Sequence, residues 1–339
     1  MSPIVGIIAN PASGKDIRRL VAHGSVFDNN EKINIIERVL LGLDALGIER
    51  VLAMPDISGL VHQASSRAKV KLRVDLLDIR PTNSAQDTTQ AAHLMARAGT
   101  GCIVTLGGDG TNRVAAKGCG YVPLMPISTG TNNAFPVMVE GTLAGLAAAV
   151  VAQRVPGVRE AGVRLARRLD VYRDGQLIDF ALVDVVAYAE RFVASGAIWD
   201  PAKIRTVVLS APHPGTIGAS AIGGYLPEAP ANGEAGMWLE LGPGGQPLLA
   251  PIAPGLVTQV SIESWRWLKV GDFGQVTVAP TVLALDGERE VPIKSGEHIE
   301  IRLSQNGPHV INVTAALHAA SRAGVFVDYP QQGVYSFEA

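Results

Sequence analysis

The sequence contains only two cysteines, Cys102 and Cys119, among its 339 residues. Two thiols do not make the disulfide framework of a small secreted domain, so the chain fits a reducing compartment. Long apolar runs are also missing, because the most hydrophobic stretch, 143–152, is about half of the ~20 residues that cross a bilayer. No basic segment followed by an apolar one opens the chain, so no signal peptide is predicted. We therefore expect a soluble cytoplasmic protein that does not enter a membrane.

A surplus of positive charge is missing as well. Lysine and arginine number 29 against 31 acidic residues, which leaves a formal net charge of −2 at pH 7. Binding a polyanion requires a basic surface, so we expect no nucleic-acid partner. Extensive disorder is excluded too, since 47% of the residues are hydrophobic and only 18% are charged. At roughly 150 residues per domain, the length then favours two packed domains.

The first 150 residues alternate short apolar runs with helical patterns. A helix is predicted over 34–46 from the spacing of its apolar residues, and another over 84–98, where Ser84 and Asp87 form a start similar to a capping box. Because strands alternate with helices, we expect a parallel sheet covered on both faces. The predicted strands are Ile4–Ala9, Arg50–Met54, Leu72–Ile79, Cys102–Leu106 and Pro123–Ile127.

After about residue 155 the pattern changes to β-rich runs between glycine- and proline-rich turns. Leu169–Arg173 and Gln176–Phe180 flank Asp174-Gly175, which is typical of a tight hairpin. Since helical periodicity is scarce here, an antiparallel β-sandwich is favoured. We thus predict an α/β chain with a parallel-sheet domain over 1–150 and a β-rich domain over 151–313. The tail, 314–339, is expected to begin as a helix and to pack back on the first domain.

Three loops follow predicted strands of the first domain, at the edge where a parallel sheet binds its ligands. Small residues in the first loop let the backbone approach a phosphate, and Lys15 supplies positive charge. It is not a Walker A loop, because Ala9 replaces its first glycine and Asp16 its Ser/Thr, so a plain turn between strand and helix stays open. The loops are Asn10-Pro11-Ala12-Ser13-Gly14-Lys15, Gly107-Gly108-Asp109-Gly110-Thr111-Asn112 and Ser128-Thr129-Gly130-Thr131-Asn132-Asn133-Ala134-Phe135-Pro136.

The second loop has three glycines around an aspartate. Its backbone N–H groups can surround phosphate oxygens at the start of a helix. The Asp109 carboxylate beside bound phosphates would hold Mg²⁺ or accept a proton from a hydroxyl nucleophile. Arg113 stands where the dinucleotide pattern G-x-G-x-x-G has its last glycine, which disfavours a dinucleotide dehydrogenase. The alternative is a tight turn with Asp109 as the helix N-cap.

The third loop offers hydroxyls, amides and Gly130, which suit ribose or phosphate oxygens. Three such loops at one sheet edge predict a nucleotide site.

Together these motifs resemble the NAD kinase and diacylglycerol kinase superfamily. Gly-Gly-Asp-Gly-Thr at 107–111 is similar to the motif that the superfamily shares, and Asn10-Pro11 with Ser13-Gly14 resembles the N-terminal motif of its lipid-kinase and archaeal-type branches. Overall the chain is most similar to the acetoin catabolism protein X group. The resemblance implies an α/β nucleotide domain followed by a β-sandwich, an active site between them, the cofactors ATP and Mg²⁺, and a homodimer or homotetramer.

The resemblance extends to the second domain. Residues 181–186 are similar to the segment in which NAD kinases hold ribose and adenine, with Asp184 present and Val183 in place of an asparagine. Residues 218–224 fall near the family's small-residue substrate loop, with a flexible surface loop as the alternative. Asp286-Gly287-Glu288 resembles the Asp-Gly-Glu of bacterial lipid kinases, which implies an acidic catalytic residue, whereas an ordinary hairpin turn is the alternative.

On this resemblance the chain is expected to phosphorylate NAD(H), giving NADP(H). Asp109, Asp286 and Glu288 are the predicted catalytic residues, and Asp184 is predicted to hold the ribose or adenine. A lipid kinase is the nearest alternative, but the basic cluster Arg164, Arg167 and Arg168 would contribute only about 3 kcal/mol at an anionic surface. A non-catalytic sensor of NAD(H) or ATP is a further alternative. The predicted nucleotide-binding residues are Asn10, Ser13, Gly14, Lys15, Gly107, Gly108, Gly110, Thr111, Asn112, Gly130, Thr131, Asn132, Asn133 and Asp184.

Overall fold

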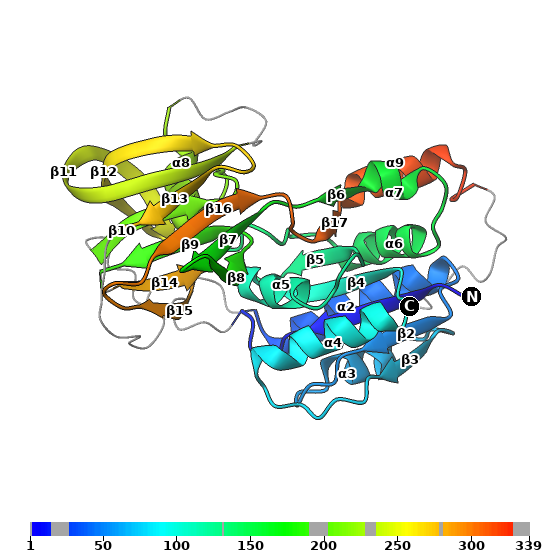
Figure 1. Ribbon diagram of the computed structural model, residues 1–339. Coiled ribbons are helices and arrows are strands. Elements are labelled where there is room, and N and C mark those ends of the chain that lie inside the picture. The colour runs from blue at the N-terminus through cyan, green and yellow to red at the C-terminus, as the bar shows by residue number, and fades with distance from the viewer. Residues whose placement is uncertain are drawn as a thin grey trace.

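The computed structural model describes residues 2–14, 27–130, 132–189, 203–227, 235–277 and 281–327. It has an α/β domain with a mainly parallel sheet, followed by a domain of antiparallel sheets (Figure 1). This arrangement confirms the predicted fold class. Among the described residues, no helix combines the length and hydrophobicity that crossing a bilayer requires.

Seven strands form the first sheet. The five predicted strands are all present, with their ends shifted by a few residues, and four of them are largely buried as expected. The third, Arg73–Leu76, is an edge strand with no buried residue, so the prediction that it is buried is wrong. Its last strand is antiparallel to its neighbour, whereas all the other pairs are parallel. In spatial order the strands are β3 (Arg73–Leu76), β2 (Arg50–Ala53), β1 (Ile4–Ala9), β4 (Cys102–Gly107), β5 (Leu124–Ser128), β17 (His309–Ile311) and β6 (Val163–Leu165).

Helices cover both faces of this sheet, and each face has its own apolar core. One face carries α2 (Asn29–Ala45), α3 (Leu60–Arg67), α6 (Gly141–Ala152), α7 (Val158–Gly162) and α9 (Val313–Arg322), and the other carries α4 (Ala85–Arg97) and α5 (Asp109–Ala116).

The two predicted helices are present, with differences at their starts. Helix α2 begins five residues before its predicted start, because the Asp28 carboxylate caps it by accepting from the Glu31 N–H at 2.8 Å. At α4 the expected capping box is only half formed. The Ser84 side chain makes no cap hydrogen bond, whereas the Asp87 carboxylate accepts from the N–H groups of Thr82 and Asn83.

The second domain consists of two antiparallel sheets packed face to face around a shared apolar core, as expected of a sandwich. The six-stranded sheet has the order β12 (Leu256–Leu268), β11 (Gly236–Ala253), β10 (Ile204–Leu209), β9 (Asp184–Tyr188), β14 (Thr281–Leu285) and β15 (Glu288–Ile293), and α8 (Ala219–Gly224) packs on it. The four-stranded sheet has the order β13 (Phe273–Val276), β16 (Ile299–Ser304), β7 (Arg168–Arg173) and β8 (Gln176–Ala181).

The chain crosses between the two domains twice. After the sandwich it returns to the first sheet as β17, which lies between β5 and β6, and then continues into α9 against α6 and α7 (Figure 1). Residues 158–165 and 309–313 therefore lie with the first domain. The division that we predicted at residues 150 and 313 stays a prediction.

Candidate functional site

The three predicted loops meet at the carboxyl edge of the parallel sheet. Strand β1 pairs with β2 on one side and β4 on the other, so the strand order reverses between β1 and β4. At such a switch point the loops diverge and leave a crevice for a ligand. The first loop is attached there by a hydrogen bond from the Asn10 N–H to the Leu106 carbonyl, at 3.0 Å.

Side-chain hydrogen bonds join the first loop to the other two. The Asn10 side-chain amide donates to Thr111 Oγ1 in the glycine loop at 2.9 Å, and the Thr129 hydroxyl donates to Ser13 Oγ at 3.0 Å. Gly14 closes the first loop with a φ of +76°, a conformation that favours glycine. The three loops therefore form one hydrogen-bonded surface.

Asp109 links the glycine loop to the third loop. It is the first residue of α5, after Gly108 as N-cap, so the alternative with Asp109 as the cap is wrong. Its carboxylate accepts from the backbone N–H of Ala134 at 3.1 Å and of Phe135 at 2.7 Å. Asp109 thus orients the third loop from the first turn of α5.

The glycines of the second loop allow close approaches. A Cβ built on Gly108 would lie 2.8 Å from Asn133 Oδ1, and one on Gly110 would lie 2.7 Å from Glu288 Oε1. The second approach is important because Glu288 belongs to the second domain. The missing side chain at Gly110 therefore lets a carboxylate from the sandwich reach the glycine loop.

Two of the predicted amide side chains stabilise the loops rather than face a crevice. Asn112 is fully buried, accepting from the Thr105 hydroxyl at 2.6 Å and donating to the Gly108 carbonyl at 2.9 Å. Asn133 donates to Ser128 Oγ and to the Gly130 carbonyl. Asn132 is partly buried in the same loop. Lys15 and Thr131 lie outside the described residues.

Lys32 was not among the predicted site residues, yet it holds the first loop in place. It is fully buried on α2, and its Nζ donates to the carbonyls of Asn10 and Pro11 at 3.0 Å and of Ser13 at 2.6 Å. A charged residue on the apolar stripe of a helix beside a strand-end loop is the signal that could have found it. By binding these carbonyls, Lys32 fixes the backbone of the first loop.

The second domain contributes the segment 182–184 and the turn between β14 and β15. Asp286 and Gly287 form a two-residue hairpin turn with φ of +51° and +81°, which confirms the hairpin alternative. The Asp286 carboxylate accepts from the N–H groups of Leu182, Val183 and Asp184 at 2.7–3.3 Å. Its side chain is fully buried, so it cannot contact a substrate in this structure.

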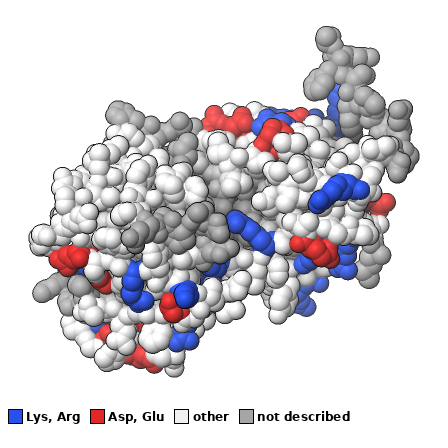
Figure 2. Space-filling model, turned by 90° about the horizontal axis from the view of Figure 1, so that it is seen from above, with Lys and Arg blue, Asp and Glu red and all other residues white. Residues whose placement is uncertain are grey.

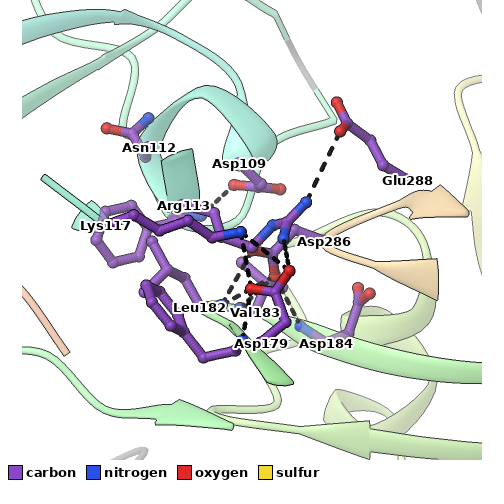
Figure 3. A network of polar contacts seen from close by, with 12 residues as sticks. Asp109, Asn112, Arg113, Lys117, Asp179, Leu182, Val183, Asp184, Asp286 and Glu288 are labelled. Carbon is purple, nitrogen blue, oxygen red and sulfur yellow. Dashed lines mark hydrogen bonds and ion pairs between the residues drawn. The ribbon is translucent and has the colours of Figure 1, made fainter. Parts of the chain in front are cut away.

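Arg113 of α5 joins the two domains through ion pairs with three carboxylates (Figure 3). Its guanidinium lies 3.2 Å from Asp179, 3.5 Å from Asp286 and 3.8 Å from Glu288, and its side chain is 0% exposed. Burial raises the pKa of Asp286, while Arg113 and the backbone donors act in the opposite direction. In the sequence, Arg113 stands out only as a departure from a dinucleotide pattern, because nothing local indicates its distant partners.

An apolar cluster supports the same interface. Phe180, Leu182 and Val183 of the second domain pack against Ala134 and Phe135 of the third loop. Val183 is therefore a buried interface residue, and the polar side chain that its segment offers is that of Asp184. Asp184 is itself 7% exposed.

Other predicted features lie elsewhere. Residues 219–224 form the buried helix α8, so the flexible surface loop expected as an alternative at 218–224 is wrong. Arg168 of the basic cluster pairs with Asp170 and stacks 4.5 Å from the centre of the Phe180 ring. Figure 2 shows positive and negative side chains interspersed among the described residues on the face seen from above.

A cavity of about 550 Å³ opens at the far end of α5 from the glycine loop. It lies beside the two chain crossings, so it is separate from the loops described above. Its lining includes Ala116, Tyr121, Leu165, Arg168, Phe180 and His309.

Comparison with known proteins supports the two-domain organisation. The family model of the ATP-NAD kinase N-terminal domain matches residues 5–155, and that of the acetoin catabolism protein X C-terminal domain matches residues 167–306. The chain is 39% identical over 346 residues to acetoin catabolism protein X of Cupriavidus necator, covering 98% of this chain and 96% of that protein.

A solved structure is similar in fold. The crystal structure of yeast NADH kinase complexed with NADH matches with a TM-score of 0.52 and 14% identity, covering 98% of this chain and 90% of that chain. At this identity the likeness concerns the fold alone.

Proposed function

The chain belongs to the acetoin catabolism protein X family, which is NAD kinase-like, and on that premise we propose that it transfers the terminal phosphoryl group of ATP to NAD(H). The proposed acceptor is the 2′-hydroxyl of the adenosine ribose, so the product would be NADP(H). The observation that carries the proposal is the hydrogen-bonded surface of three strand-end loops, which the Glu288 carboxylate approaches from the second domain.

The loops suit the phosphates of ATP. The glycine loop leads into the N-terminus of α5, where backbone N–H groups and the helix dipole favour anions. The segment Asn10–Gly14 lies beside it, attached through Thr111. Phosphoryl transfer depends mainly on such positioning and on charge stabilisation, so this surface supplies what the donor side of the reaction requires.

The carboxylates at the glycine loop fit Mg²⁺. This ion is usually bound by one or two carboxylates together with substrate phosphates and water, and Asp109 and Glu288 supply two carboxylates at the loop. Among the described residues no three His, Cys, Asp or Glu side chains converge into a closed metal site. When bound, Mg²⁺ would neutralise charge on the transferring phosphoryl group.

The acidic residues receive distinct proposed roles. Either Glu288 or Asp109 accepts the proton of the acceptor hydroxyl, and 54% of the Glu288 side chain is exposed. The hydroxyl oxygen forms the new bond to the γ-phosphorus of ATP, and ADP leaves. Asp184 binds the ribose or the adenine. Asp286 fixes the backbone of 182–184 and is a positioning residue rather than a catalytic one, because its carboxylate is fully buried.

The test is turnover by the purified protein with Mg²⁺ and ATP, or polyphosphate, against NAD⁺, NADH and diacylglycerol vesicles. We expect NADP(H) formation that Asp109→Asn abolishes. The matched control is Asp75→Asn, an aspartate of β3 that pairs with Arg50 and Arg73, and it should keep full activity.

The other outcomes separate the alternatives. Phosphorylation of diacylglycerol alone would replace the proposal with a lipid kinase. Tight binding of ATP or NAD(H) without turnover of any acceptor would replace it with a nucleotide sensor.

A further inference from the structure

Arg113 connects the glycine loop to the second-domain elements that would face the acceptor. These elements, the segment 182–184 and the turn between β14 and β15, are called the acceptor side below, and the glycine loop is called the donor side. Arg113 lies one turn after Asp109 on α5, and all three of its carboxylate partners belong to the second domain. Asp179 lies on β8, Asp286 is the first residue of the turn between β14 and β15, and Glu288 is the first residue of β15. One side chain therefore contacts both this turn and β8, the strand that leads into 182–184 (Figure 3).

Through Asp286 this contact reaches the backbone of 182–184. Three consecutive N–H groups point at the Asp286 carboxylate, which is a concave anion-binding arrangement of backbone donors. In return, the Asp286 N–H donates to the Asp184 carbonyl at 3.0 Å. The Asp286 carboxylate thus helps to position the backbone that carries Asp184, on the side opposite to Ser210, whose N–H donates to the Val183 carbonyl and whose hydroxyl donates to the Leu182 carbonyl.

The glycine loop does not depend on Arg113 in the same way. It is held inside the first domain by the bond from Asn10 to Thr111, by Asn112 and by the bonds from the third loop to Asp109. Removing Arg113 should therefore leave the donor side in place and release the acceptor side.

We propose that Arg113 is a positioning residue for the acceptor, which aligns the 182–184 segment and Glu288 with the glycine loop through its ion pairs to Asp286 and Glu288. A displacement of about 1 Å between reacting groups costs about 100-fold in rate. A buried arginine with several carboxylate partners is suited to this task, because its planar guanidinium directs its N–H donors at fixed angles in addition to supplying positive charge. The inference rests on the proposed function, since it assigns Arg113 a place in that reaction.

The matched control is Lys117, which lies on the same helix and pairs with the same Asp179 at 2.8 Å. Within the described residues, the side-chain ion pairs and hydrogen bonds of Lys117 go to Asp179 alone, and its side chain is 33% exposed. Lys117→Met therefore removes a cation from the interface without disturbing the β14–β15 turn.

The experiment compares Arg113→Met, Arg113→Lys and Asp286→Asn with Lys117→Met in the full chain. For Arg113→Met we expect kcat/KM for the acceptor to fall about 100-fold, with the Kd of Mg²⁺-ATP from calorimetry unchanged within threefold. The kcat/KM of Arg113→Lys should lie between those of wild type and Arg113→Met, because lysine keeps the positive charge but lacks the planar guanidinium that binds two carboxylates in fixed directions. Asp286→Asn should reproduce the loss, and combining it with Arg113→Met should cost less than the two losses together.

A second readout does not depend on turnover. Hydrogen exchange of the N–H groups of 182–184 should accelerate at least tenfold in Arg113→Met and Asp286→Asn, and stay at the wild-type rate in Lys117→Met. If the exchange rates and the kcat/KM of Arg113→Met match those of Lys117→Met, the positioning role is refuted. If ATP binding weakens as much as kcat/KM, Arg113 supports the whole site and the specific role is refuted as well. A wild-type protein without turnover would contradict the proposed function, while hydrogen exchange would still decide whether Arg113 orders the 182–184 segment.

Discussion

Replacing Lys32 by methionine tests whether a buried cation holds the first loop in its nucleotide-binding form. Lys32 Nζ donates to three loop carbonyls and, at 3.3 Å, to Asn29 Oδ1 on its own helix. Methionine keeps most of the side-chain volume but donates no hydrogen bond. The substitution therefore removes the polar contacts and leaves the packing of α2 nearly unchanged.

The magnitude follows from what happens to the three carbonyls. A buried acceptor left without its donor costs about 1–3 kcal/mol. Asn10, Pro11 and Ser13 are only partly buried, so water can replace some of the lost bonds. We therefore expect the free energy of unfolding to fall by about 2–4 kcal/mol. A loop that no longer keeps its shape should also weaken ATP binding about tenfold, which corresponds to about 1.4 kcal/mol.

Urea denaturation followed by far-ultraviolet circular dichroism measures the first effect, and calorimetric titration with Mg²⁺-ATP measures the second. The control is Arg38→Met on the same helix, which removes a partly exposed cation paired with Glu31 and Glu140 and should cost less than about 1 kcal/mol. A Lys32→Met protein that loses no more stability than Arg38→Met, with wild-type ATP affinity, would refute the reasoning.

Three further predictions concern the glycine loop and the thiols. Gly107→Ala would place a Cβ 2.5 Å from the Thr111 Cβ, so the loop backbone must shift. Calorimetry should then show at least a tenfold loss of ATP affinity, and a loss below threefold would contradict this geometry. Burial raises the pKa of Cys102 to about 12 and that of Cys119 to about 11, so neither thiol should react with a disulfide reagent at pH 8 until the protein is denatured. Because unfolded thiols ionise near pH 9 while the buried ones stay protonated, the urea midpoint should fall as the pH rises above 9, and a flat profile would contradict this assignment.

The first domain was largely predictable from local sequence. Buried parallel strands are nearly continuous apolar runs, so Ile4–Ala9 and Cys102–Gly107 stand out between turn residues. The loops after them were placed at one edge because parallel strands all end on the same side of a sheet. The hairpin at Asp174-Gly175 was predictable for a similar reason, since the dipeptide itself favours the turn.

The features that were missed depend on contacts between residues far apart in the chain. Lys32 fits its position only because the Asn10–Ser13 loop folds over α2. Arg113 needs carboxylates at positions 179, 286 and 288, and no pattern within α5 indicates them. Asp286 could be read as a turn residue or as a catalytic acid, and only its burial against the 182–184 backbone distinguishes the two.

The insertion of β17 between β5 and β6 has a consequence for how the protein is made. Synthesis proceeds from the N-terminus, so β5 emerges almost two hundred residues before the strand that pairs with its outer edge. Until His309–Ile311 leaves the ribosome, the only strand contact of that edge among the described residues is the single bridge from Val137 to Ile127. An open strand edge is a template for aggregation. The nascent chain therefore depends on late-made residues to close its first domain, and a truncation before residue 309 should be recovered mainly in inclusion bodies.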